Sequence, residues 1–352
     1  MEREDRGMPF IQQYENIAWY EGAEVRILDR RAYPARVEFV TCKSHVEVMQ
    51  AIRDMVTQSA GPYVAAPMGM ALSAWECRNL GEKEQLEYLK EAALCLQSAR
   101  PTTRERLKLC TEACIPVAEK ALREGRRTDL AIRDSVVESC NRRYSRMARI
   151  GEELCDLFPQ SGTVMTQCYA DTALGAMLRA CRQKGKKIRL FCPETRPFLQ
   201  GARLTATVCA EMGFETTVIT DNMPSFVMAN EHVDIFTCAA DAITCDGYVF
   251  NKVGTSQIAI CAKHYGVPVY VSGAPDKGHP TRDTVKIEMR NPEETLEAMG
   301  VRTAARDMGI KGYYPAFDMT PPQLITGIVT DRGIFSPMEL DRYFIDSFQL
   351  LV

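Results

Sequence analysis

Two side chains suited to acid–base chemistry stand at the ends of apolar runs. Cys168 lies within Thr163-Val-Met-Thr-Gln-Cys168-Tyr-Ala-Asp-Thr-Ala-Leu-Gly175, and Asp241 ends the run Asp234-Ile-Phe-Thr-Cys-Ala-Ala-Asp241. In an α/β protein the carboxyl ends of the strands form the rim where ligands bind. A thiol and a carboxylate at one rim predict a site for proton transfer.

The setting of Cys168 allows two interpretations. Residues 169–175 read as the start of a helix, and a thiol at a helix N-terminus has a lowered pKa, as reactive cysteines require. Alternatively, Cys168 is one more buried cysteine among the fourteen of the chain. The local sequence leaves both interpretations open.

Asp241 is flanked by Ala-Ala and Ala-Ile and has few local partners. We therefore expect it to be buried, which would raise the pKa of the carboxyl group and suit it to donate a proton near neutral pH. The alternative is an N-cap for a following helix, a common role for aspartate.

Further polar side chains follow other apolar runs. Gln200 opens a helix after a proline-bounded loop, where amides suit an anion such as phosphate; in that loop Glu194 and Arg196 could form a structural ion pair. Asp221 and Asn222 could order the site or cap a helix. For Asn251 and Lys252, taken alone, a surface turn is the more natural interpretation. The candidates from this group are Gln200, Asn222, Asn251 and Lys252.

The elements that must position these residues change character along the chain. Short alternating runs predict strands near residues 17–20, 24–29 and 36–40, and helical spacing then predicts helices over 44–60, 83–98 and 104–158. From Gly162, β-rich runs at 188–191, 216–219, 233–237 and 267–271 alternate with helical patterns, the signature of a parallel, doubly wound sheet. We expect an α/β protein with a smaller, mainly helical N-terminal domain carrying short strands (1–145) and a Rossmann-like catalytic domain (146–352).

Composition excludes several classes of function. The net charge of −3 over 352 residues gives no electrostatic case for nucleic acid or an anionic membrane, and no apolar run is long enough to span a bilayer. The charged start does not resemble a signal peptide. The cysteines are scattered singly, which indicates a reducing cytoplasm and no metal site. No GxGxxG or Walker motif is present, so no nucleotide cofactor is expected.

Taken together, the motifs resemble the 5-methylthioribose-1-phosphate isomerases and the related regulatory subunits of translation initiation factor 2B. The resemblance covers nearly the whole chain. It is carried by Glu194-Thr-Arg-Pro197, Leu199-Gln-Gly-Ala-Arg-Leu-Thr205, Thr220-Asp-Asn-Met223, Asn251-Lys-Val-Gly-Thr255, Tyr314-Pro-Ala-Phe-Asp318 and Thr320-Pro-Pro-Gln-Leu-Ile-Thr326, with Ser98-Ala-Arg-Pro-Thr102 in the N-terminal part.

This resemblance implies a homodimeric enzyme of methionine salvage without cofactor or metal. The isomerases use a cysteine and an aspartate, which are present here as Cys168 and Asp241, whereas the initiation-factor subunits generally lack the pair. By the same matching to the family's motifs, Arg100 falls where the family holds substrate and phosphate, as do Gln200, Asn251 and Lys252. The implied reaction converts an aldose 1-phosphate, either methylthioribose 1-phosphate or a relative such as 5-deoxyribose 1-phosphate, to the ketose 1-phosphate.

The chain also departs from the family pattern. The family's Arg-Gly-Ala-Pro-Ala-Ile-Gly phosphate loop reads Gln58-Ser-Ala-Gly-Pro-Tyr-Val64, so an arginine expected on the phosphate is a glutamine. The family's His-Cys-Asn reads Gln167-Cys168-Tyr169, and the arginine after the catalytic acid is Ala242. These changes keep two alternatives open, a non-catalytic initiation-factor-like or sugar-phosphate-binding protein and a ribose 1,5-bisphosphate isomerase.

Overall fold

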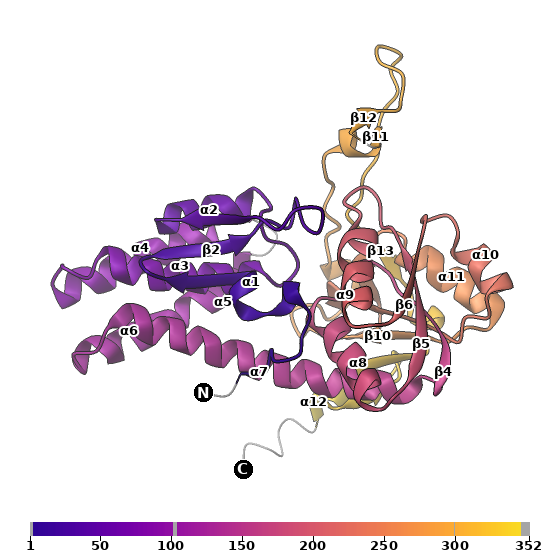
Figure 1. The fold of residues 1–352 in the computed structure, drawn as a ribbon, viewed down its shortest axis with the longest axis horizontal. Coiled ribbons are helices and arrows are strands. Elements are labelled where there is room, and N and C mark those ends of the chain that lie inside the picture. Colours follow the sequence, from indigo (N-terminus) through magenta and orange to yellow (C-terminus); the bar gives the residue numbers. More distant parts are fainter. Residues whose placement is uncertain (1–2, 101–103, 299, 346–352) are drawn as a thin grey trace. The chain divides into compact units, whose positions relative to one another are not determined.

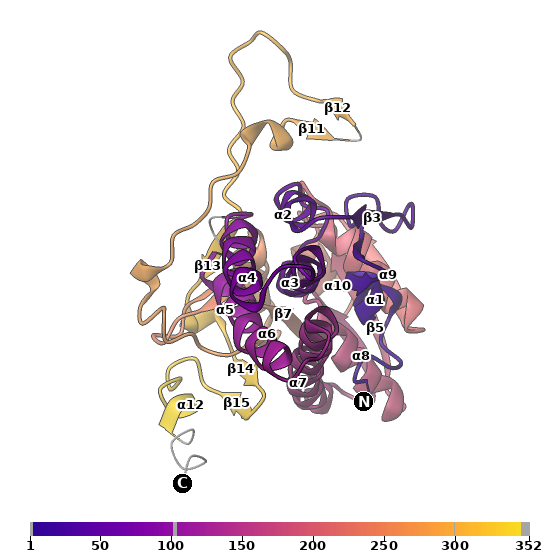
Figure 2. The ribbon, with the colours of Figure 1, turned by 90° about the vertical axis from the view of Figure 1, so that its left-hand side faces the viewer.

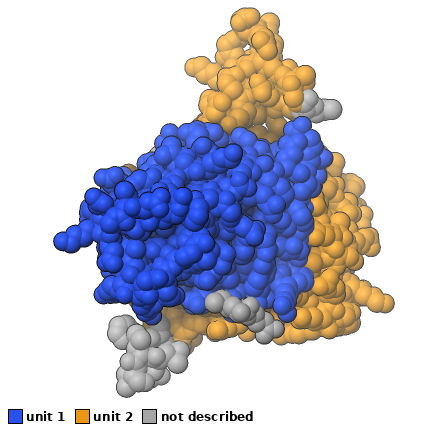
Figure 3. Space-filling model, turned by 60° about the vertical axis from the view of Figure 1, so that its left-hand side comes forward, with its two compact units in different colours: residues 1–145 blue, residues 146–352 orange. Residues whose placement is uncertain are grey.

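In the computed structural model the chain forms two compact units, Met1–Ser145 and Arg146–Val352, which Figure 3 colours separately. The structure describes residues 3–100, 104–298 and 300–345. The expected α/β class is confirmed, with helices and short strands in the first unit and a largely parallel sheet in the second. Within the described residues, no helix combines the length and apolar character needed to cross a membrane.

The first unit packs helices against a small antiparallel sheet. Its strands are β1 (Ala18–Glu21), β2 (Glu24–Leu28) and β3 (Phe39–Cys42), in that order across the sheet. Its helices are α1 (Tyr14–Ile17), α2 (His45–Arg53), α3 (Pro62–Glu76), α4 (Glu82–Gln97), α5 (Arg104–Glu112), α6 (Cys114–Arg123) and the first part of α7 (Thr128–Leu157). Helix α3 is buried along nearly all its length and forms the centre of the core.

One predicted helix is shorter than expected. The helix predicted over 44–60 ends at Arg53, because Met55 turns to a φ of +61° and the chain leaves the helical path. Gly61 and Pro62 mark the start of α3 and not the end of α2. Pro62 lies in the first turn of α3, where a missing N–H is tolerated. A Cβ atom on Gly61 would lie 1.9 Å from the Thr57 hydroxyl, so only glycine fits this junction.

The second unit is built on a seven-stranded sheet (Figure 1). Across it the strands run β15 (Gly333–Phe335), β14 (Gly327–Thr330), β10 (Val269–Ser272), β7 (Ile235–Ala239), β4 (Ser161–Met165), β5 (Lys187–Pro193) and β6 (Glu215–Ile219), and all are parallel except β15. Within this sheet the chain therefore begins near the middle at β4, continues outward through β5 to β6, and returns to β7 on the other side of β4. The order reverses between β4 and β7, which is where doubly wound proteins bind their ligands.

Helices connect these strands. They are α8 (Thr172–Gln183), α9 (Ala206–Glu211), α10 (Pro224–Asn230) and α11 (Thr255–Tyr265), with α12 (Arg342–Ile345) near the end of the described chain. A single π-helical turn, Gly201–Thr205, precedes α9. Most residues of β4 and β7 are buried, as expected for parallel strands covered by helices.

A second, three-stranded sheet was not expected from the sequence. It orders β13 (Phe317–Thr320), β9 (Val249–Lys252) and β8 (Ala242–Ile243), all antiparallel. Between β10 and β13 the chain makes a long excursion, residues 273–316, that we call the arm. Figures 1 and 2 show that its central part, with β11 (Glu297–Ala298) and β12 (Val301–Arg302), stands away from the seven-stranded sheet.

Candidate active site

Cys168 and Asp241 follow neighbouring strands of the large sheet. β4 pairs with β7 through Val164 opposite Ile235 and Met165 opposite Phe236, and each candidate comes just after its strand ends. Both therefore lie at the point where the strand order reverses. The two side chains are close enough that the negative charge of Asp241 raises the pKa of the Cys168 thiol. The structure thus brings together the two residues that the sequence analysis proposed as a pair.

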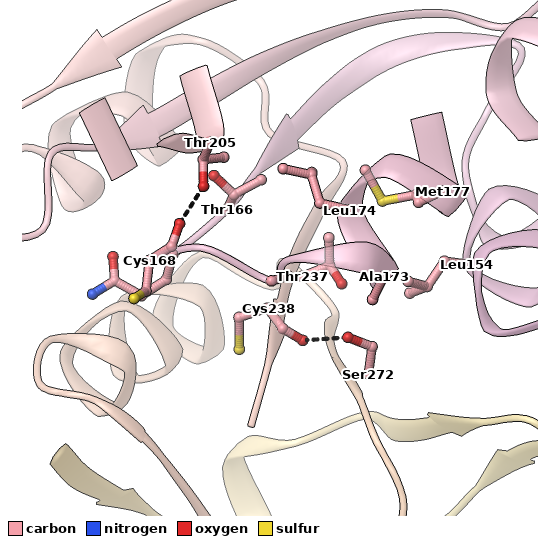
Figure 4. Close-up of a pocket in the computed structure, with 12 residues that line it drawn as sticks. Leu154, Thr166, Cys168, Ala173, Leu174, Met177, Thr205, Thr237, Cys238 and Ser272 are labelled. Carbon is pink, nitrogen blue, oxygen red and sulfur yellow. Dashed lines mark hydrogen bonds between the residues drawn. The ribbon is translucent and has the colours of Figure 1, made fainter. Parts of the chain in front are cut away.

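The backbone of Cys168 is held from both sides. Its φ is +58°, a left-handed conformation that is uncommon for residues other than glycine. Its N–H donates to the Thr195 hydroxyl at 3.3 Å, and its carbonyl accepts a hydrogen bond from the hydroxyl of Thr205 in the π turn (Figure 4). These contacts compensate the conformational cost and fix the direction of the thiol.

The prediction of a lowered thiol pKa was wrong. Helix α8 begins only at Thr172, so Cys168 lies before its first turn and not at its N-terminus. Burial raises the pKa of Cys168 to about 11, the charge of Lys252 counteracts part of this rise, and Asp241 adds to it. At neutral pH the side chain is therefore a protonated thiol that can donate a hydrogen bond.

Both local interpretations of Asp241 were also wrong. Its side chain is exposed and not buried as expected. It does not cap a helix either, because the chain enters strand β8 directly afterwards. Its backbone N–H donates to the carbonyl of Phe250 at 2.9 Å, which fixes the residue against the small sheet. The side chain of Asp241 is thus accessible to solvent.

Asn251 and Lys252 are buried strand residues and not a surface turn. Both lie on β9 and are 5% exposed. The Asn251 amide donates to the Thr255 hydroxyl at 3.0 Å, and the Lys252 ammonium lies 5.0 Å from the centre of the Phe317 ring on the paired strand. Burial lowers the pKa of Lys252, while the charges of Cys168 and Asp241 raise it. A buried cation next to the thiol is well suited to bind an anion.

A small cavity of about 20 Å³ adjoins Cys168, with room for about one water molecule (Figure 4). Thr205, Cys238 and Ser272 line it together with apolar side chains, and Gln167 completes the wall beside the thiol. The Gln167 amide nitrogen donates to the Val253 carbonyl at 3.2 Å, and its oxygen is buried without a hydrogen-bond partner in the described chain. The cavity is too small for a sugar, so a substrate would lie over the thiol on its solvent side.

The loop after β5 is ordered by Asp221. Its carboxylate accepts hydrogen bonds from the backbone N–H groups of Thr195 and Arg196, both at 2.7 Å, so Asp221 orders the loop and does not cap α10. The Arg196 guanidinium donates to backbone carbonyls of the arm at Glu294 and Glu297. This loop carries Cys168's partner Thr195.

The remaining candidates differ in their surroundings. Gln200 immediately precedes the π turn, and its side-chain oxygen is buried without a partner among the described residues. Asn222 is exposed, and its side-chain oxygen accepts from the Thr220 hydroxyl. Both follow strands of the large sheet, β5 and β6, at the same edge as Cys168.

Two residues of interest belong to the first unit. Arg100 follows α4 and is half-buried, and the next residues of its motif, 101 and 102, lie outside the described residues. Gln58 is buried, and its backbone carbonyl accepts from the Arg30 guanidinium at 2.8 Å. A substrate role for Arg100 stays a prediction.

The sequence analysis did not single out Arg290 and Tyr314, two residues of the arm that pair through their backbones near Lys252. Tyr314 could have been found from the sequence, because it begins the motif Tyr314-Pro-Ala-Phe-Asp318. Arg290 could not, because its neighbours come from distant segments of the chain. Among the described residues, no three histidine, cysteine, aspartate or glutamate side chains gather as a metal ion would require.

Comparison with known proteins places the chain in a family. The model of the initiation factor 2 subunit family matches residues 62–337. The chain belongs to this family. It is 34% identical over 340 residues to methylthioribose-1-phosphate isomerase 1 of Pseudothermotoga lettingae, covering 90% of this chain and 94% of the relative. It is 33% identical over 341 residues to a 5-deoxyribose 1-phosphate isomerase of Clostridium botulinum, covering 91% and 95%.

Solved structures give the same result. A 5-methylthioribose 1-phosphate isomerase from Pyrococcus horikoshii superposes with a TM-score of 0.81 at 28% identity, over 96% of this chain and 98% of that one. The translation initiation factor eIF-2B subunit delta from A. fulgidus superposes with a TM-score of 0.79 at 30% identity, over 92% and 96%. The predicted resemblance and the predicted class of enzyme, a sugar-phosphate isomerase, are confirmed.

Proposed function

We propose that this family member converts methylthioribose 1-phosphate, or 5-deoxyribose 1-phosphate, to the corresponding ketose 1-phosphate. The observation that carries the proposal is the meeting of Cys168 and Asp241 at the strand reversal, with the buried cation of Lys252 beside them. Relatives named for each of these two substrates match the chain about equally well, so both are proposed.

Asp241 is proposed to open the sugar ring. The phosphate on the anomeric oxygen blocks ordinary hemiacetal opening, so a proton must reach the ring oxygen as its bond to C1 breaks. Asp241 is exposed in this structure and accessible to substrate from the solvent side. Bound substrate would cover the carboxyl group and favour its protonated form, because burial disfavours the charge.

Cys168 is proposed to act at C1 and C2. Removing a proton from C2 would require the thiolate, and with a pKa of about 11 its formation at pH 7 costs about 5 kcal/mol. A shift of hydride from C2 to C1 avoids this cost: the thiol stays protonated and hydrogen-bonded to the sugar, and the C2 hydroxyl gives its proton to the Asp241 carboxylate as C2 becomes a carbonyl. The electrostatics of the site therefore favour the hydride route over the enediol route.

The remaining candidates are proposed to hold the substrate. Lys252, Gln200 and Arg100 would bind the phosphate, and Asn222 and Asn251 would bind sugar hydroxyls. Lys252 has the strongest support, because it is a buried cation close to the thiol.

The experiment that tests this function is a phosphorus-31 and carbon-13 NMR time course with purified protein. The panel contains methylthioribose 1-phosphate, 5-deoxyribose 1-phosphate and ribose 1,5-bisphosphate. We expect a ketose 1-phosphate from one or both of the first two substrates. Absence of any product with folded protein would refute the proposal.

A non-catalytic regulatory role is the second candidate. The similarity to the A. fulgidus initiation-factor subunit, at 30% identity, favours it. Binding of a pentose 1-phosphate without turnover in the same NMR experiment would select this role.

A further inference from the structure

Two segments of the arm, residues 288–290 and 314–316, meet beside Lys252 through a ladder of backbone hydrogen bonds. The N–H of Arg290 donates to the carbonyl of Tyr314 at 2.9 Å, and that of Ala316 donates to Glu288 at 2.8 Å. Ala316 in turn accepts from the N–H of Val253, the residue after Lys252, at 3.2 Å. The ladder therefore fixes Arg290 and Tyr314 next to the strand that carries the buried lysine.

Tyr314 presents a buried hydroxyl that lacks a partner. The residue is 2% exposed, and within the described part of the chain its hydroxyl makes no hydrogen bond. Burial raises its pKa to about 12, Glu294, Cys168 and Glu288 add to the rise, and Arg290 opposes it. The hydroxyl therefore keeps its proton at neutral pH. A buried polar group without a partner is costly, and in native proteins such a group calls for an explanation such as a ligand.

Arg290 places a second cation beside Lys252. Its guanidinium nitrogen Nε lies 3.3 Å from the Glu288 carboxylate, and its guanidinium carbon lies 5.6 Å from the centre of the Phe198 ring, two residues before Gln200. The charge of Arg290 lowers the pKa of Lys252, so the two cations repel each other in the empty site. A phosphate bound between them would turn this repulsion into two attractions.

We infer that Arg290 and Tyr314 bind the phosphate of the substrate together with Lys252. This inference rests on the proposed function and adds to it the phosphate ligands that the arm supplies. A planar guanidinium and a phenolic O–H are both suited to donate hydrogen bonds to phosphate oxygens.

The Tyr314→Phe variant tests the inference with little risk of misfolding. It removes only the hydroxyl, which makes no hydrogen bond to any of the described residues, so the melting temperature should stay the same or rise. KM for the pentose 1-phosphate should rise about 10- to 100-fold, the loss expected for one hydrogen bond to a charged phosphate oxygen, with kcat within about 3-fold. An unchanged KM would show that the hydroxyl does not reach the phosphate.

Arg290→Gln tests the charge. KM should rise about 10- to 100-fold, as loss of a charge-assisted hydrogen bond requires, and Arg290→Lys should recover part of the loss. The matched control is Arg306→Gln, which removes an exposed arginine from the same arm and should leave KM unchanged. Equal KM values in wild type, Arg290→Gln and Arg306→Gln would assign Arg290 to fixing the arm and overturn the inference while leaving the proposed function intact.

A binding experiment separates this inference from the proposed function. Inorganic phosphate should slow the alkylation of Cys168 by iodoacetamide in wild type and in Arg306→Gln, but at least 10-fold more phosphate should be needed in Arg290→Gln. This result would support the anion site even if the wild type turned over no sugar. Equal protection of all three proteins, or no protection of the wild type at saturating phosphate, would overturn the inference.

Discussion

The buried thiol of Cys168 should react slowly with alkylating reagents near neutral pH. Its pKa is about 11, against about 8.5 for an unperturbed cysteine. At pH 8 about one side chain in a thousand is then a thiolate, against about one in four for an unperturbed thiol. The higher pKa makes the thiolate itself about 10-fold more nucleophilic, so alkylation should be slower by a net factor of about 20.

The assay measures the rate of carbamidomethylation of the peptide that carries Cys168 by mass spectrometry from pH 6.5 to 10.5. Circular dichroism at each pH confirms that the protein remains folded. The rate should still be rising between pH 9.5 and 10.5. A plateau below pH 9 would refute the reasoning, because it would mean that burial does not control this thiol.

Charge variants sharpen the same prediction. Asp241→Asn removes a charge that raises the pKa of Cys168, so alkylation at pH 8.5 should become faster; Lys252→Met removes a charge that lowers the pKa, so alkylation should become slower. Cys95, a partly exposed thiol on α4, serves as the internal reference. If both variants changed the rate in the same direction, the assigned electrostatics would be wrong.

Three further predictions concern the loops and the route. Asp221→Asn should lower the free energy of unfolding in urea by about 1.5–3 kcal/mol, since two backbone N–H groups lose their charged acceptor; a similar loss for the exposed Asp156→Asn would contradict this. Gly201→Ala should prevent correct folding, because its Cβ would lie 1.7 Å from the Pro193 carbonyl oxygen; a wild-type melting temperature would refute it. Substrate deuterated at C2 should give ketose deuterated at C1; loss of the label to water would select the enediol route.

The sequence was sufficient to predict the parallel sheet and the strand ends that Cys168 and Asp241 follow. Strand-forming runs followed by polar residues identified where Cys168 and Asp241 leave their strands, because local patterns determine those ends. Local sequence failed for the pKa of Cys168 and for the exposure of Asp241. The pKa of Cys168 depends on burial by several segments, and the exposure of Asp241 depends on a turn into β8 that two residues scarcely signal.

The environment of Lys252 depends on pairing across long separations. Asn251 and Lys252 read as a surface turn because β9 is a short strand whose partner, β13, follows only after the whole arm. Arg290 and Tyr314 were missed for the same reason, since only the backbone ladder between residues 288–290 and 314–316 brings them to the lysine. Non-local backbone pairing of this kind leaves little trace in composition or periodicity.

The most direct test of the account is the steady-state turnover of methylthioribose 1-phosphate by wild type, Cys168→Ser, Asp241→Asn and the control Cys95→Ser. The account predicts that kcat falls about 10²- to 10⁴-fold in the first two variants, with KM within a few-fold of wild type, and that Cys95→Ser is unaffected. Near-normal turnover by either Cys168→Ser or Asp241→Asn would contradict the claim that these two residues carry the reaction.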